Sequence, residues 1–312
     1  MADIRKPLYH FWTPNTWYLW LFLGLLRLSF LLPYRVRLRF FKSVGRLLHR
    51  FDITRRATAR RNIELCFPEL TADERDTLIL AHYEAIGASL MEFGLARWAS
   101  REKIAAMSRI EGAEHLTTAL QQGEAVILLT GHFTSLELSG RIMQHICPRI
   151  DAVFQQHPNK FLIEILRTTR ERMAESTIAS SDVRSMVRSL RSGVALWFAP
   201  DQSVRSKQSV LITFFGEPAM TNTATSKLAK LGKAIAIPWF VCRLPEGGYL
   251  MTILPPMENF PSDDPVEDTK QFVAILEEQI RRCPEQYIWT YRKFKGRPEP
   301  LPDAYANLDE LK

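Results

Sequence analysis

Short apolar runs alternate with helical patterns along the second half of the chain. Four runs are rich in β-branched and aromatic residues and are bounded by glycine or proline: 124–131, 194–200, 234–243 and 249–256. Such runs are typical of strands covered on both faces. Helical patterns cover residues near 160–174, 182–192, 221–232 and 266–282. This alternation predicts the α/β class: a layered domain with a largely parallel or mixed sheet flanked by helices.

Two further helices are predicted closer to the N-terminus. Residues 35–51 have apolar side chains at helical spacing on an otherwise basic segment, which indicates an amphipathic helix. Residues 73–97 form the second, with Thr71 as its N-cap and Glu74 placed three residues on, as in a capping box. No internal repeat or long linker interrupts the chain. We therefore expect one soluble domain over residues 35–312.

Residues 1–34 have the composition of a membrane anchor. Residues 17–26 are uninterrupted apolar, Arg27 intrudes, and residues 28–32 are mostly apolar again. A span needs roughly 20 apolar residues, so the stretch is borderline. Aromatic residues crowd its N-terminal end, as they do at membrane interfaces. We predict one anchor helix, spanning or deeply embedded, and the alternative is an ordinary buried helix. The basic residues that follow predict a cytoplasmic position for the body.

Charge is distributed unevenly along the chain. Residues 1–61 hold 13 Lys and Arg against 2 Asp and Glu, a net charge of +11, whereas the remainder has a net charge of −4. A basic segment indicates a partner with negative charge: anionic lipid, nucleic acid or an acidic protein. Because the basic residues adjoin the apolar segment and no nucleic-acid recognition motif is present, we expect anionic membrane lipids and no nucleic acid.

Cysteine and glycine usage narrows the function classes. The four cysteines lie far apart without a CxxC pair, which excludes a zinc ribbon and a disulfide scaffold and fits a reducing compartment. No Gly-rich phosphate loop is present, so an ordinary nucleotide-binding enzyme is disfavoured. We expect neither a metal nor a cofactor.

Candidate chemistry lies at residues 125–140. An apolar strand ends at Thr130, Gly131 permits a sharp turn, and His132 follows at the strand-to-helix junction. Glu137 comes five residues later and can reach the ring if His132 is still in the turn. A His–carboxylate pair supplies a general base and the group that orients it. The alternative is that both residues merely cap a helix start. Without a GxSxG serine, direct attack by a substrate hydroxyl is the simpler chemistry.

Five longer segments extend this motif into a family resemblance. The chain resembles the late acyltransferases of lipid A biosynthesis in RRNIELCFPEL (60–70), LMEFGLARW (90–98), GHFTSLELSGR (131–141), WFAPDQ (197–202) and PEQYIWTYRKFKGRP (284–298). The segments cover nearly the whole chain. The His-x4-acid signature, here His132 and Glu137, is shared with the glycerolipid acyltransferases, which more often have Asp at the second position. The resemblance implies a glycerolipid-acyltransferase-like fold.

The resemblance also implies a reaction. A fatty acyl chain would move from acyl carrier protein to a hydroxyl of a 3-hydroxyacyl chain on Kdo-lipid IVA, at the cytoplasmic face of the Gram-negative inner membrane. His132 would take the hydroxyl proton, and Glu137 would orient His132. We expect alanine at either position to remove all or nearly all transfer.

Three more residues are candidates for substrate binding. Arg170 and Arg172 match family arginines and would hold a phosphorylated headgroup, although a solvated basic face is the alternative. Asp201 follows an apolar strand and would hold Arg170 or a substrate hydroxyl, or simply cap a loop. The chain departs from many relatives at 154–156, where Phe-Gln-Gln stands in place of Tyr-Arg-Pro.

Two other functions remain open at this stage. A lysophospholipid acyltransferase would use the same dyad with a glycerolipid acceptor. A non-enzymatic binder of membranes or nucleic acid would use only the basic N-terminal fifth, and its activity would survive loss of His132.

Overall fold

The computed structural model describes residues 8–155, 159–204, 206, 208–306 and 308, and its centre is a seven-stranded sheet. The strand order is β1-β9-β8-β2-β5-β3-β4. Neighbours from β8 to β4 pair in parallel, β9 is antiparallel to β8, and β1 is parallel to β9. The strands are β1 (Ser108–Glu111), β2 (Ala125–Leu129), β3 (Ile150–Phe154), β4 (Ser176–Ala179), β5 (Ala195–Phe198), β8 (Ala234–Arg243) and β9 (Tyr249–Ile253). The predicted mixed, mostly parallel sheet is confirmed.

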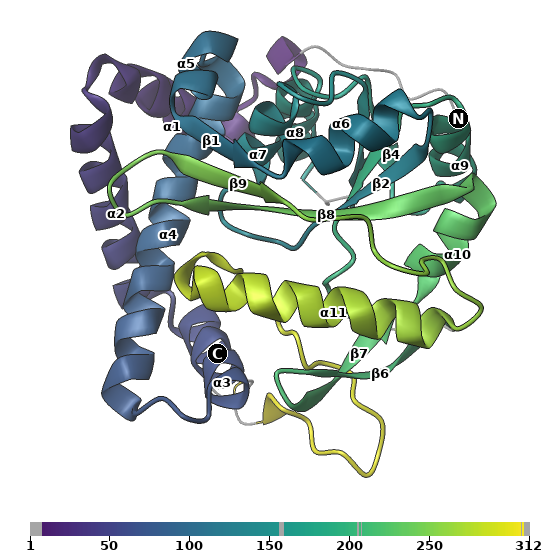
Figure 1. Cartoon of the computed structure of the whole chain (residues 1–312). Helices are drawn as coiled ribbons and strands as arrows, with labels where there is room; N and C mark the ends of the chain where they lie inside the picture. The colour runs from purple at the N-terminus through teal and green to yellow at the C-terminus, as the bar shows by residue number, and fades with distance from the viewer. Residues whose placement is uncertain (1–7, 156–158, 205, 207, 307, 309–312) are drawn as a thin grey trace.

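Helices cover both faces of this sheet, as alternate residues of the central strand show. Ile127 and Leu129 of β2 belong to a core cluster shared with α9 (Val183–Arg191), α10 (Ala224–Gly232) and α11 (Pro265–Arg282). Val126 and Leu128 point to the opposite cluster, shared with α6 (Ala113–Gln121) and α7 (Leu136–Met143). Figure 1 shows α11 below the sheet and α6 and α8 (Lys160–Arg170) above it. Burial on both faces explains why the strands read as continuous apolar runs.

Most of the predicted helices form where expected. The basic helix is α2 (Tyr34–Phe51), and α4 (Ala72–Trp98) begins with the predicted capping box between Thr71 and Glu74. Sequence patterns did not predict α3 (Ile53–Cys66), α5 (Arg101–Ala106) or the separate hairpin of β6 (Ser209–Phe214) and β7 (Glu217–Asn222). The moderately polar composition of these elements carries little periodic signal. The 3₁₀ turns are η1 (Leu8–Phe11), η2 (Pro14–Thr16), η3 (Ser29–Leu31) and η4 (Pro284–Gln286).

The N-terminal apolar segment is divided into short pieces. Its helix α1 spans only Trp17–Leu28, and η3 and Pro33 separate it from α2. Twelve residues extend about 18 Å along a helix axis, against a hydrocarbon core about 30 Å thick. Among the described residues, no helix combines the length and apolarity needed to cross a membrane. The predicted transmembrane helix is thus not found among the described residues.

Helix α2 packs closely against α4 at two glycines (Figure 1). A Cβ atom on Gly45 would lie 2.0 Å from the backbone oxygen of Tyr83, and one on Gly87 would lie 2.1 Å from that of Phe41. Only residues without a side chain allow the two backbones to approach this closely. The amphipathic helix α2 is therefore an integral part of the domain.

The structure contains one disulfide that cysteine spacing did not predict. Cys242 near the end of β8 is bonded to Cys283 at the end of α11, across a sequence separation of 41 residues. Spacing along the chain did not reveal this pair because the sheet and α11 bring the two residues together. Cys66 and Cys147 are free and buried.

Candidate functional site

The site begins at the carboxyl end of β2. The strand pairs with β5, with Leu129 opposite Phe198, and the amide of Thr130 extends this pairing to the carbonyl of Phe198 at 3.1 Å. Gly131 follows in a tightly packed place, since a Cβ atom there would lie 2.6 Å from Leu276 Cδ1 and would require that side chain to move. The chain turns here and places His132 at the carboxyl end of the central strands. This placement agrees with the predicted strand–turn–helix geometry.

The ring of His132 is paired with Asp201. Its Nδ1 atom is hydrogen-bonded to Asp201 Oδ1, and its backbone amide donates to Asp201 Oδ2 at 2.9 Å. Asp201 lies three residues after β5, so adjacent parallel strands bring the two residues to one edge. With the carboxylate accepting from Nδ1–H, Nε2 carries the lone pair. No described residue is hydrogen-bonded to Nε2, and the side chain is 29% exposed.

Asp201 is held in its charged form by its surroundings. Its side chain is 1% exposed, and burial alone would raise its pKa, but the interactions with His132 and with Lys293 lower the pKa to about 2. Tyr287 donates its hydroxyl proton to Oδ2 at 3.0 Å, and Lys293 Nζ donates to the Asp201 carbonyl at 2.6 Å. Asp201 is therefore an ionised, buried carboxylate that can orient an imidazole and stabilise an imidazolium.

The segment after α11 supports the His132 loop. The amide of Ile288 donates to the His132 carbonyl at 3.0 Å, and the amide of Thr134 donates to the Gln286 carbonyl at 2.7 Å. The same segment supplies Tyr287 and Lys293 to Asp201. Sequence reasoning missed these supporting residues, although PEQYIWTYRKFKGRP contains them. The signal was a run of polar and aromatic residues directly after an amphipathic helix.

Glu137 makes a different pair. It lies in the first turn of α7 and accepts from Arg170 at the end of α8, with Nη2–Oε1 at 2.6 Å and Nε–Oε2 at 3.1 Å. Both side chains are mostly buried, and the Arg170 guanidinium lies 5.7 Å from the centre of the Trp197 ring. This bidentate pair leaves Nη1 of Arg170 without a protein partner among the described residues.

His132 and Arg170 face one cavity of about 320 Å³. Its walls combine aromatic and aliphatic side chains with a few polar groups, as in many small-molecule sites. The lining residues are His132, Leu136, Val153, Phe154, Gln155, Arg170, Ser180, Trp197, Phe198, Ala199, Pro200, Gln202, Val204, Asn222, Ala224 and Thr225. The arrangement provides a general base, a fixed cation and an apolar surface within one chamber.

The structure brings four of the five predicted site residues together, but with different partners. The carboxylate on the His132 ring is Asp201, whereas Glu137 pairs with Arg170 and makes no hydrogen bond to His132. Arg172 does not line the cavity; its side chain is exposed, and its carbonyl accepts from Arg141 Nη1 and from Gln144 Nε2 at 3.0 Å. Of residues 154–156, Phe154 and Gln155 line the cavity, and residue 156 lies outside the described residues. No cluster of His, Cys, Asp or Glu in the described part of the chain is arranged to hold a metal ion.

Comparison with known proteins identifies the family of the chain. Residues 5–296 match the family model described as bacterial lipid A biosynthesis acyltransferase. The chain is 35% identical to the lipid A biosynthesis lauroyltransferase of Escherichia coli over 94% of this chain and 96% of the relative. It is 34% identical to the E. coli palmitoleoyltransferase over 91% and 93% of the two chains. It is 30% identical to a lipid A biosynthesis acyltransferase of Haemophilus influenzae over 95% and 96%.

Proposed function

The chain belongs to the bacterial lipid A biosynthesis acyltransferases, and we propose that His132 is the general base of its reaction, oriented by Asp201. The proposed donor is an acyl thioester of acyl carrier protein. The proposed acceptor is a hydroxyl of a 3-hydroxyacyl chain on Kdo-lipid IVA. The observation that carries the mechanism is the buried Asp201–His132 pair, whose imidazole lines the 320 Å³ cavity.

The reaction proceeds by direct transfer between the two substrates. His132 Nε2 accepts the proton of the acceptor hydroxyl as the oxygen attacks the thioester carbonyl carbon. Asp201 stabilises the imidazolium that forms and keeps Nδ1 protonated throughout. When the tetrahedral intermediate collapses, the carbon–sulfur bond breaks and the imidazolium returns its proton to the leaving thiolate. The products are an ester and the free thiol of the carrier.

Glu137 and Arg170 act as a unit in this proposal. Glu137 occupies Nε and Nη2 of Arg170, so the guanidinium is fixed against Trp197 while Nη1 is left for substrate. A fixed arginine that retains one free donor edge suits a phosphate or carbonyl oxygen of the bound substrates. In this reading Glu137 influences His132 only indirectly, through the position of the acceptor.

We further propose that α1 and α2 seat the protein on the cytoplasmic face of the inner membrane, lying along its surface. Helix α1 buries Leu23 and Leu26 against the domain but leaves Leu21, Leu25 and Leu28 more than half exposed. Further exposed apolar residues lie on the elements from η1 through α2 to the start of α3. They include Tyr9, Trp12, Trp17, Tyr18, Leu31, Leu32, Val36, Phe40, Leu47, Phe51 and Ile53. Many exposed apolar residues on helices that also carry basic residues are typical of interfacial helices.

Mass spectrometry of the lipid product tests the reaction. Purified protein is incubated with Kdo₂-lipid IVA and a panel of acyl carrier protein thioesters. We expect a mass gain of one acyl group, abolished in His132→Ala, and the preferred thioester reports the chain length. Acylation of lysophosphatidic acid instead would reassign the acceptor. Undiminished transfer by a folded His132→Ala protein would refute the base.

A further inference from the structure

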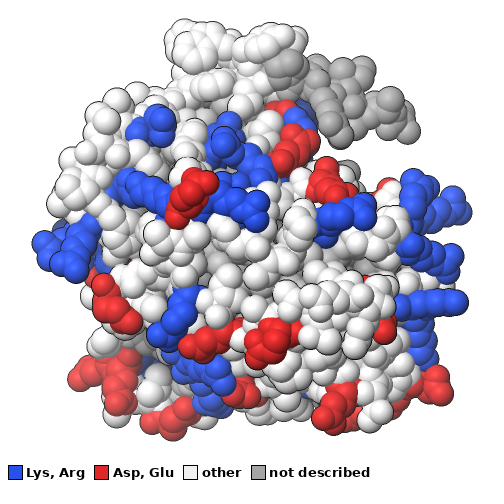
Figure 2. All heavy atoms as spheres, turned by 45° about the horizontal axis from the view of Figure 1, so that its top comes forward, with Lys and Arg blue, Asp and Glu red and all other residues white. Residues whose placement is uncertain are grey.

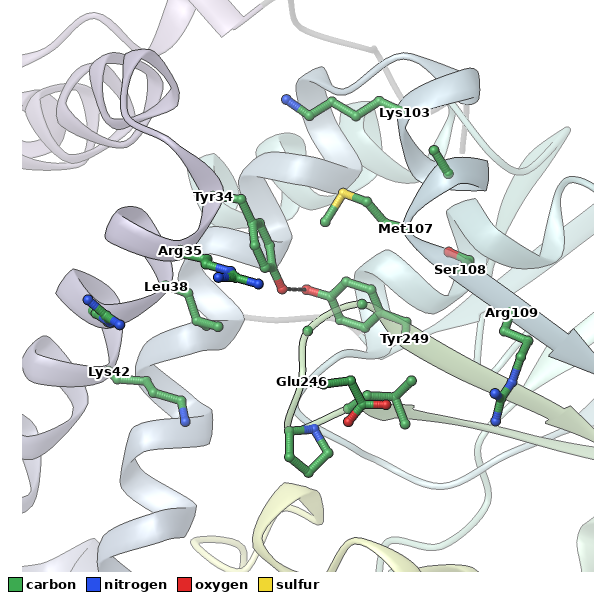
Figure 3. Close-up of a pocket in the computed structure, with 16 residues that line it drawn as sticks. Tyr34, Arg35, Leu38, Lys42, Lys103, Met107, Ser108, Arg109, Glu246 and Tyr249 are labelled. Carbon is green, nitrogen blue, oxygen red and sulfur yellow. Dashed lines mark hydrogen bonds between the residues drawn. The ribbon is translucent and has the colours of Figure 1, made fainter.

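A second cavity lies at the surface, away from His132. It has a volume of about 870 Å³ and shares no lining residue with the catalytic cavity. Figure 3 shows α2 on one side, α5 and β1 on the other, and the turn between β8 and β9 closing the space. The hydroxyls of Tyr34 and Tyr249 meet across it at 3.5 Å. The proposed reaction uses none of these residues.

The lining of this cavity is strongly cationic. Five basic side chains surround it, Arg35, Arg39, Lys42, Lys103 and Arg109, against the single acid Glu246. Lys42 forms an ion pair with Glu84, with Nζ 3.6 Å from Oε2, and Arg109 forms one with Glu111, with Nη2 3.2 Å from Oε1. The other three have no ion-pair partner among the described residues and are exposed. Figure 2 shows Lys and Arg gathered across the upper half of the face it presents, beside an uncharged margin. Unpaired cations around a hollow favour an anionic ligand.

The same cavity also has an apolar wall. Leu38 comes from α2, Ala106 and Met107 end the α5 segment, and Leu244 and Pro245 form part of the hairpin turn. A small inorganic anion would have no use for this surface. A ligand that carries both a phosphate and an aliphatic portion matches both parts of the lining.

Helix α2 contributes residues both to the cavity and to the surface proposed to contact the membrane. Val36 and Phe40 are exposed on its apolar stripe, and Arg35 and Arg39 precede them by one residue each, about 100° around the helix. If the apolar stripe enters the acyl region, the arginines lie at the depth of the lipid headgroups. The cavity then opens where lipid phosphates are concentrated.

We propose that this cavity binds the phosphate headgroup of one anionic phospholipid, as a non-catalytic site that fixes the orientation of the enzyme on the bilayer. The cations hold the phosphate, and the apolar wall contacts the glycerol and the first methylenes. The position of the site at the bilayer rests on the proposed seating of α1 and α2, whereas lipid binding itself does not. A test in detergent therefore separates the two proposals.

Native mass spectrometry of the full chain in detergent counts bound lipids directly. Phosphatidylglycerol is titrated against wild type, an Arg39→Gln/Lys103→Gln variant and an Arg50→Gln/Arg55→Gln control. The control loses the same charge from exposed positions of α2 and α3 outside the cavity. We expect one saturable adduct in wild type and control. The cavity variant lacks two of the cations that would hold the phosphate, so it should bind at least about tenfold more weakly.

Three results would overturn the proposal. Equal weakening in both variants would show diffuse electrostatic attraction. Displacement of the lipid by millimolar inorganic phosphate would show a free-anion site instead of a lipid site. Loss of acyl carrier protein binding in the cavity variant, with the lipid adduct unchanged, would make the cavity a docking site for an acidic protein. Flotation on neutral phosphatidylcholine vesicles reports the apolar seating separately.

Discussion

Replacing Asp201 by asparagine tests the assignment of the orienting carboxylate. Three donors converge on this side chain: Oδ2 accepts from the His132 amide at 2.9 Å and from the Tyr287 hydroxyl at 3.0 Å, and Oδ1 pairs with the ring Nδ1. Asparagine has one acceptor oxygen. If that oxygen serves the two donors at the Oδ2 position, the amide NH₂ faces Nδ1. The ring must then accept at Nδ1 and carry its proton on Nε2, where it can no longer act as a base.

The size of the effect follows from the same contacts. The pKa of Asp201 is lowered from 3.8 to about 2, even though burial opposes this change. After the opposing effect of burial, the net balance favours the ionised carboxylate by about 2 kcal/mol. Losing that stabilisation for the imidazolium lowers the rate roughly 10²-fold, and the wrong tautomer lowers it further. We expect kcat to fall between about 10² and 10⁴-fold. KM should change little because Asp201 does not line the cavity.

Steady-state transfer kinetics provide the assay, with product measured by mass spectrometry. Asp151→Asn is the matched control: Asp151 is also a buried, hydrogen-bonded aspartate, but it pairs with Ser176 and does not line the cavity. The control should keep nearly full kcat. An Asp201→Asn protein that is folded and retains kcat within about threefold of wild type would refute the orienting role.

Three further predictions concern the arginine pair, acid stability and membrane seating. Glu137→Gln should raise KM for the lipid acceptor about tenfold in the same assay, with a smaller loss in kcat than at position 201, because it loosens Arg170 and leaves the ring in place. Burial lowers the pKa of His82 to about 4, so the folded state binds fewer protons than the unfolded state between about pH 4 and 6.5, and stability falls as the pH falls through that window. Urea unfolding should give a free energy about 2 kcal/mol lower at pH 5 than at pH 8 from this group, a difference that His82→Gln removes. Leu25→Gln should reduce flotation with vesicles about fivefold, whereas Leu211→Gln, also exposed but on β6, should not.

Each of these expectations has a contrary result. A kcat loss in Glu137→Gln equal to that of Asp201→Asn would indicate that Glu137, too, orients the imidazole of His132. An unchanged pH dependence in His82→Gln would assign the acid sensitivity to other groups. Equal loss of flotation for both leucine variants would indicate that vesicle binding does not use the α1 surface.

The helices and strands that the sequence predicted correctly are those whose residue pattern is distinctive within a short stretch of the chain. The runs that form β2, β5, β8 and β9 are apolar because helices cover both faces of the sheet. The capping box at the start of α4 joins Thr71 to Glu74, which is only three residues away in the sequence. The edge strands β1 and β4 contain four residues each and are only partly buried, so they leave little pattern. The apolar composition of the N-terminal segment did not reveal that the segment is interrupted at Ser29–Leu31 and Pro33, which leaves α1 too short to span a membrane.

The amino-acid sequence by itself determined the strand that precedes the turn at Gly131 and His132, the residue types of the site and, through its longer segments, the family. Tertiary structure decided which carboxylate meets the imidazole. Glu137 is five residues from His132 but is turned to Arg170, whereas Asp201, 69 residues away, reaches the ring. Parallel pairing of Leu129 with Phe198 places the loops after β2 and β5 at one edge of the sheet. Side-chain partners there depend on strand register and helix position, which act over distances that sequence spacing does not measure.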